Sequence, residues 1–176
     1  MKSFLTMFLI LTLLAATTSF AEQIVVDFDD LEGGYTPIPA GYGGIADWAG
    51  WTTFDTPDEN YPPHSGLVRC LAFSNDEIIT FGQEYVFDGV WISGSYNPTW
   101  VVWFELYLGG VLVHTSEGLP PSSDPTWLPS GYDLAVDQVK IIHTFSNFFC
   151  FDDFTYTTTE VPVEGKTLSS VKNLYR

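Results

Sequence analysis

Two pairs of adjacent aspartates are the residues best suited to chemistry in this 176-residue chain. Asp29-Asp30 follows a short apolar segment near the start, and Asp152-Asp153 lies in an aromatic segment near the end. On an extended strand, Asp152 shares a face with core-like residues two positions away, where an unpaired carboxylate costs free energy. Two alternatives stay open: the acids bind a metal, or Asp29-Asp30 caps a turn while Asp153 faces solvent.

A second group of chemically useful side chains lies in a long Gly- and Pro-rich segment, residues 29–65. Trp48, Trp51 and Tyr35 are aromatic residues that can stack on sugar rings, and Asp47 can accept hydrogen bonds from sugar hydroxyls. Long loops often carry function. The alternative is that these aromatic rings fold back and complete the core, because aromatic residues dominate core burial.

Catalytic motifs are missing from the sequence. It has no G-x-S-x-G elbow, no H-E-x-x-H and no phosphate-binding glycine loop. With 22 acidic residues, some pair always suits a glycosidase, so that signal is uninformative. The histidines at 64, 114 and 143 lack the spacing of zinc ligands. We therefore predict that the protein is not an enzyme.

The charge balance restricts the partners. Only Arg69 and Lys140 are basic between Glu22 and Gly165, a stretch with a net charge of −20. Nucleic acid and anionic membrane surfaces require clustered Lys and Arg, so both are disfavoured. Cations, neutral sugars and basic proteins remain, or the charge serves only to keep the chain soluble.

The first 21 residues predict export. Lys2 precedes an apolar run, and Ser19 and Ala21 form a small-x-small cleavage site, which is typical of a signal peptide. No later segment is long enough to span a membrane, so we expect a secreted, extracellular or cell-surface protein. An oxidising compartment favours a disulfide between Cys70 and Cys150. The alternative is two buried thiols.

Between its loops, the mature chain consists of short alternating or aromatic segments with almost no helical periodicity. The expected strands cover residues 23–28, 66–73, 77–81, 85–93, 99–108, 111–115, 136–144 and 148–156, with a tight turn at Gly109-Gly110. This pattern predicts an all-β fold, two antiparallel sheets packed as a β-sandwich or jelly roll over residues 22–157. The tryptophans at 91, 100 and 103 are expected in its core. Residues 158–176 are expected to form a linker and a basic tail, with a short helix over 167–175.

The segments V-D-F-D-D-L at 26–31, L-Y-L-G-G-V-L-V at 106–113 and F-C-F-D-D-F-T-Y at 149–156 occur in a suggestive order. Together they resemble secreted bacterial β-sandwich proteins of the galactose-binding-like and carbohydrate-binding-module type. The resemblance covers roughly residues 24–157. It implies a structural calcium near the first and last strands, which Asp29 and Asp152 would ligate. The proline-rich sorting motif and terminal membrane span of many such proteins are absent.

These features together predict an exported, non-catalytic β-sandwich that binds carbohydrate or an extracellular polymer through Trp48, Trp51, Tyr35 and Asp47. The first alternative is a structural or adhesive surface protein without a small ligand. It predicts that the loop aromatics are buried and that a sheet edge or tail is exposed for assembly. A glycan-active hydrolase or lyase is the third reading. The basic tail is expected to serve an export or surface partner, or else to be a frayed terminus.

Overall fold

Ten strands provide nearly all the regular structure in the residues that the computed structural model describes, namely 21–71, 78–145 and 148–159. The predicted signal peptide, apart from Ala21, and the tail from residue 160 onward, with its predicted helix, lie outside these ranges. The elements are β1 (Gln23–Val26), a 3-10 turn η1 (Tyr42–Gly44), β2 (Ile45–Asp47), β3 (Thr52–Phe54), β4 (Arg69–Leu71), β5 (Ile78–Ser93), β6 (Val102–Leu108), β7 (Val111–Thr115), β8 (Thr126–Pro129), β9 (Val136–His143) and β10 (Cys150–Thr158). The all-β prediction is confirmed. Within the described ranges, no helix has the length and apolar character needed to cross a membrane.

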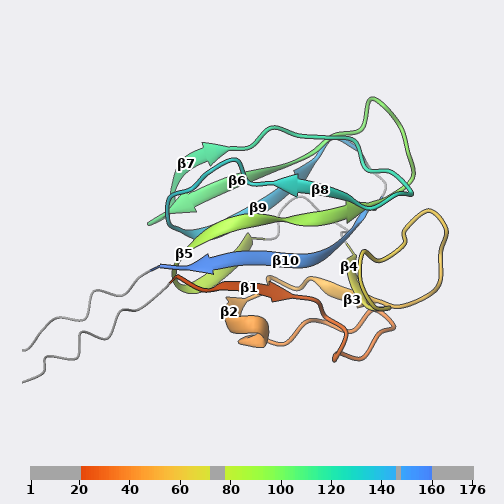
Figure 1. The fold of residues 1–176 in the computed structure, drawn as a ribbon, viewed down its shortest axis with the longest axis horizontal. Helices are drawn as coiled ribbons and strands as arrows, with labels where there is room; N and C mark the ends of the chain where they lie inside the picture. The colour runs from red at the N-terminus through yellow and green to blue at the C-terminus, as the bar shows by residue number, and fades with distance from the viewer. Residues whose placement is uncertain (1–20, 72–77, 146–147, 160–176) are drawn as a thin grey trace, which may run out of the picture. The chain divides into compact units, whose positions relative to one another are not determined.

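All ten strands belong to one hydrogen-bonded antiparallel network. Its main path is β3-β4-β10-β5-β9-β6-β7, while β1 pairs with β10, and β2 and β8 pair with β5. The division into two separate sheets is therefore not confirmed, although the strands do enclose a common core. Strands β8, β5, β10 and β1 lie side by side, in that order, in the layer nearest the viewer in Figure 1.

Strand β5 connects the parts of this network. The sequence predicts two strands here, but the structure has one strand of 16 residues, Ile78–Ser93. Its first part pairs with β9 and β2, and its last part pairs with β10 and β8. The two parts of β5 can pair with different strands because a register shift separates them.

The four strands β8, β5, β10 and β1 bury one face in the core and leave the other face outermost. Alternation along a strand sends successive side chains to opposite faces. The inner face consists of the buried residues Leu128, Phe87, Val90, Ile92, Phe154, Tyr156 and Val26. The residues between them in the sequence therefore form an outer face.

The two cysteines lie on neighbouring strands but point to opposite faces. In the β4–β10 register, Cys70 is opposite Phe151 and Leu71 is opposite Cys150. Because neighbouring residues on a strand alternate, the two sulfur atoms are on different sides of the sheet. Both are free, buried thiols, and the predicted disulfide is not present in the structure. Burial raises the pKa of the Cys150 thiol to about 12 and that of Cys70 well above its usual value.

Candidate functional site

The predicted sugar platform is not formed, because its two tryptophans are core residues. Trp48 is 1% exposed and Trp51 is 2% exposed. Trp48 packs edge-on against Phe28 and Phe154, and Trp51 packs edge-on against Phe151. The long loop therefore supplies aromatic rings to the core, as the alternative interpretation expected, and neither indole has a face available to a sugar.

The two other residues predicted for the platform are exposed but serve local structure. The Tyr35 ring is tilted against Phe54 with 5.6 Å between ring centroids. Oδ1 of Asp47 accepts a hydrogen bond from the backbone N–H of Ala49 at 2.8 Å. With both tryptophans buried, Tyr35 and Asp47 have no adjoining indole surface with which to form the predicted site.

Three of the four paired aspartates, Asp29, Asp152 and Asp153, have a different role from the one expected: they hold one loop, residues 64–68, which we call the acid-held loop. Oδ1 of Asp29 accepts the N–H groups of Leu67 and Val68 at 2.7 and 3.0 Å. Oδ2 of Asp152 accepts the N–H groups of the two residues at the start of the loop at 2.9 and 3.0 Å. The aspartates thus satisfy the backbone of a loop far from them in sequence, which stabilises its conformation.

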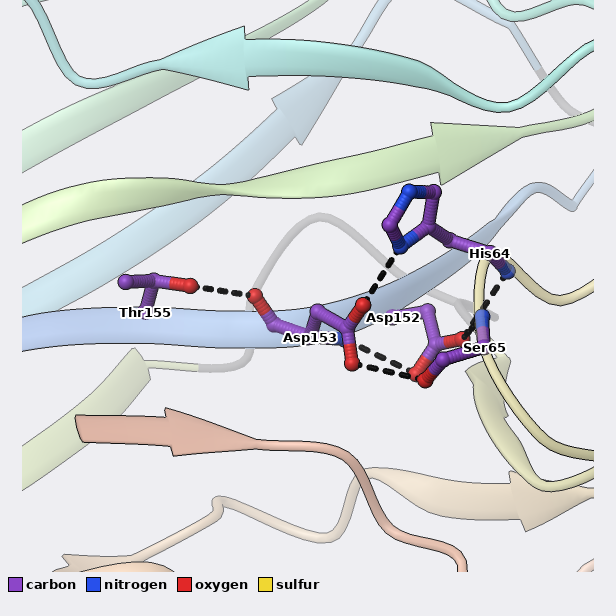
Figure 2. Close-up of polar contacts among 5 residues, drawn as sticks. All are labelled: His64, Ser65, Asp152, Asp153 and Thr155. Carbon is purple, nitrogen blue, oxygen red and sulfur yellow. Dashed lines mark hydrogen bonds and ion pairs between the residues drawn. The ribbon is translucent and has the colours of Figure 1, made fainter.

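Asp153 completes this arrangement through side chains (Figure 2). Its Oδ2 lies 2.5 Å from Nδ1 of His64, and its Oδ1 accepts a hydrogen bond from the Ser65 hydroxyl at 2.8 Å. The backbone of Asp153 has a positive φ of 48°, and the β10–β5 register shifts between Asp152 and Thr155. This irregularity lets two consecutive carboxylates reach the same loop, which a regular strand would not allow.

The pKa of Asp152 is raised strongly in the folded protein. Asp152 is 2% exposed, and its burial raises its pKa from the ordinary 3.8 to about 7. The negative charge of Asp153 raises the pKa further, whereas hydrogen bonds from the backbone N–H groups oppose the shift. A carboxyl group with this pKa changes its charge near neutrality.

Calcium binding by Asp29 and Asp152 stays a prediction. Each carboxylate contacts a different part of the acid-held loop, and each already accepts two backbone N–H groups of that loop. Over the described ranges, no three His, Cys, Asp or Glu side chains are grouped closely enough to hold a metal ion.

The acid-held loop places His64 on an aromatic surface that the sequence did not predict. The imidazole stacks on the indole of Trp91, with 3.6 Å between centroids and 7° between planes. Across the β5–β8 pair, Trp91 is directly opposite Trp127, and their centroids are 5.9 Å apart. Both indoles are only partly buried. His64, Trp91 and Trp127 therefore form a continuous aromatic strip.

Gly89 makes room for the Trp127 ring. A Cβ atom on Gly89 would lie 2.3 Å from the backbone carbonyl oxygen of Leu128 and 2.9 Å from Cζ2 of Trp127, so the backbone of β8 and the edge of this indole both come too close to Gly89 for a side chain. The φ of Gly89 is 149°, which residues with a side chain rarely adopt. The glycine thus allows the indole to lie close to the sheet instead of standing away from it.

A row of polar side chains continues from Trp127 across the layer. Oδ2 of Asp88, next to Gly89 in β5, accepts hydrogen bonds from the Thr157 hydroxyl at 2.8 Å and from Nε2 of Gln23 at 3.1 Å. Thr157 and Gln23 are paired residues of β10 and β1. The polar row therefore crosses three strands, β5, β10 and β1, and it offers a carboxylate, a hydroxyl and an amide.

We refer to Gln23, Thr157, Asp88, Trp91, Trp127 and His64 as the outer-face site. The sequence did contain a signal for it, since Trp91 lies between Val90 and Ile92, and this alternation places the indole opposite the core. The prediction of Trp91 as a core residue was wrong because it rested on the position of the tryptophan in a strand and did not ask which face of the strand the indole occupies. Partly exposed indoles beside a polar row can stack on a ring and bind its hydroxyl groups.

Comparison with known proteins provides no family for this chain. It matches no protein-family model, no curated protein and no solved structure. The fold and the outer-face site therefore stand on the geometry described above.

Proposed function

We propose that this protein is an exported, non-catalytic binder of carbohydrate or a similar extracellular polymer, and that the outer-face site is where the ligand binds. The observation that carries the proposal is the pair of partly exposed tryptophans, Trp91 and Trp127, next to the Asp88–Thr157–Gln23 row. A sugar has apolar ring faces and polar edges, and this surface offers partners for both.

The layout of the site favours an extended ligand over a small one. Its residues come from four adjacent strands and from the acid-held loop, so they are distributed across a sheet surface. Strand-borne side chains are held more rigidly than loop side chains, which reduces the entropy lost on binding. A chain of linked sugars that lies across the strands would contact both the aromatic strip and the polar row.

The contacts of His64 support binding without catalysis. A histidine held at Nδ1 by a buried carboxylate is the arrangement found in Ser–His–Asp enzymes. Here, however, the Ser65 hydroxyl donates to Asp153 and not to the imidazole. Among the described residues, no hydroxyl group hydrogen-bonds to His64 as the nucleophile of such enzymes does, and the stacking on Trp91 gives His64 a structural role.

The test is a binding screen with matched variants. The wild-type protein should bind at least one polysaccharide in a glycan array, and Trp127→Ala should weaken that binding at least tenfold without changing the melting temperature by more than a few degrees. Tyr96→Ala is the control, because Tyr96 is an aromatic residue with 66% exposure outside the outer-face site. Equal binding by wild type and Trp127→Ala would contradict the proposal, as would the absence of any saccharide ligand.

A second candidate function, a structural or adhesive role, is favoured by two observations. Trp48 and Trp51 are buried, as that alternative predicts. Strand β7 also ends the main strand path and exposes apolar side chains, with Val111 64% and Leu112 48% exposed. An uncharged, apolar edge strand can pair with another chain. Sedimentation of wild type and Val111→Lys across a concentration series distinguishes this role, which requires self-association that the lysine abolishes.

A further inference from the structure

We infer that the saccharide bound at the outer-face site carries protonated amino groups, so that its class is an amino sugar with free amines. This inference rests on the proposed function and adds the charge of the ligand to it. It follows from the acids that lie beside the aromatic strip and from the positions of the basic residues in the described structure.

The first argument concerns Asp88, which lies in the middle of the site. Both hydrogen bonds that it accepts, from Thr157 and Gln23, end on Oδ2. Neither of these hydrogen bonds uses Oδ1, and neither donor carries a positive charge. The edge of the Trp127 indole lies beside Gly89, the next residue of β5 after Asp88. A sugar ring on this indole would therefore place its substituents beside a carboxylate, where an ammonium group is favoured over a neutral acetamide.

The second argument concerns the two Lys and Arg residues within the described ranges, neither of which lies on the outer face. Arg69 is 1% exposed, and its guanidinium donates to backbone carbonyl groups of Phe54, Thr56 and Leu67. Lys140 is on β9, opposite Ile78 and Glu105. A negatively charged sugar, such as a uronic acid or a sulfated sugar, would therefore be repelled by the carboxylates of this site. Neither Lys nor Arg of the described ranges lies there to neutralise its charge.

The third argument concerns the remaining charges around the aromatic strip. His64 contacts Asp153, and Asp152 lies next to Asp153 in the same strand. The described ranges contain 18 acidic residues and two basic ones, so the wider field is negative as well. Such a field raises the local concentration of cationic ligands and weakens as salt screens it.

The experiment compares two saccharides with the same backbone: the hexamer of β-1,4-linked glucosamine and its fully N-acetylated counterpart. Binding is measured by calorimetry with the intact mature protein at pH 6, in low and high salt. The free-amine hexamer should bind about fivefold more tightly in low salt, which is the upper end of the range for one exposed ion pair. High salt should reduce this ratio towards one.

Two single-charge variants separate a local effect from the overall charge. Asp88→Asn should remove most of the preference for the free-amine hexamer. Glu117→Gln removes one exposed acid outside the outer-face site and should leave the preference intact. Trp127→Ala keeps Asp88 but should bind both hexamers weakly. Melting temperatures of all variants identify any that fail to fold.

Each result has a distinct meaning. A preference that Asp88→Asn removes and Glu117→Gln keeps supports the inference. Equal affinity for both hexamers, or preference for the acetylated one, overturns the inference and leaves the proposed function intact. Equal loss of preference in both charge variants also overturns it, because attraction by net charge then suffices. Binding of neither hexamer, nor of any glycan in the array, overturns the proposed function and the inference with it.

Discussion

Replacing Asp152 with asparagine should make the protein more stable at pH 8 and should flatten the dependence of its stability on pH. Asp152 is buried, and its pKa in the folded protein is about 7, against an ordinary value of 3.8. The folded protein therefore binds a proton that the unfolded chain has already released. The stabilising contribution of that proton is complete below about pH 4 and is lost as pH rises through 7.

The size of the effect follows from these two pKa values. The shift from 3.8 to about 7 corresponds to about 4 kcal/mol of stability, of which about 3 kcal/mol is lost between pH 5 and pH 8. Asparagine has no charge to bury, and its carbonyl oxygen can still accept the N–H groups of His64 and Ser65. It gives up the bond from the Asp153 N–H, a cost of about 1 kcal/mol. The variant should therefore exceed wild type at pH 8 by about 3 kcal/mol, or roughly 10 °C in melting temperature.

Urea unfolding at half-unit steps from pH 5 to pH 8 measures this difference directly. The two proteins should differ by no more than about 1 kcal/mol at pH 5 and should diverge as pH rises. Asp133→Asn is the control, because Asp133 is exposed in the loop before β9. Parallel pH profiles for wild type and Asp152→Asn would refute the reasoning, as would a variant that is less stable than wild type at pH 8.

Three further changes test the packing around the acid-held loop. Gly66→Ala should destabilise the fold by about 2–4 kcal/mol in urea unfolding, because φ is 47° at Gly66 and a methyl group there would overlap the Asp29 carboxylate. An unchanged midpoint of urea unfolding would contradict this. Arg69→Ala should cost about 3 kcal/mol or more in the same assay. It removes a buried side chain with three hydrogen bonds to backbone carbonyl groups, and its guanidinium lies 4.3 Å from the centroid of the Phe54 ring; a loss below 1 kcal/mol would contradict it. Without reductant, a thiol reagent should detect neither Cys70 nor Cys150 in the folded protein and both in denaturant, because the thiols are buried and free. Detection of no thiols in denaturant would instead establish the disulfide that the sequence predicts.

Strand positions were predictable wherever local pattern and turn chemistry agreed. The hairpin at Gly109-Gly110 is the clearest case: β7 has the predicted bounds, and both glycines have positive φ, as a two-residue hairpin turn requires. Strand β8 was missed because Pro125 precedes its four residues and Pro129 is the last of them, and prolines indicate a loop. It forms nonetheless because β5 offers it an open edge.

The site was only partly predictable, because its residues meet through long-range pairing. The sequence identified the acidic pairs as unusual. The loop residues that Asp29, Asp152 and Asp153 contact are, however, 38 to 89 positions away from them in the sequence. No local pattern predicts that the carboxylates of Asp29, Asp152 and Asp153 converge on one loop. The edge of Trp127 lies beside Gly89, a residue of the neighbouring strand. Assignment by local context, loop or strand, therefore placed Trp48 and Trp51 at the surface and Trp91 in the core, whereas Trp48 and Trp51 are buried and Trp91 is only partly buried.

The central position of β10 determines when the chain can fold. Residues 150–158 form the last described strand, yet β10 pairs with β1, β4 and β5, and its register with β1 joins Gln23 to Thr157. Until β10 has been synthesised, the strands on both sides of it lack their shared neighbour, and the acid-held loop lacks two of its three acids. Contacts between such distant residues make folding slow. We therefore expect a chain emerging from the ribosome to stay open until β10 has been synthesised, which is compatible with the proposed export.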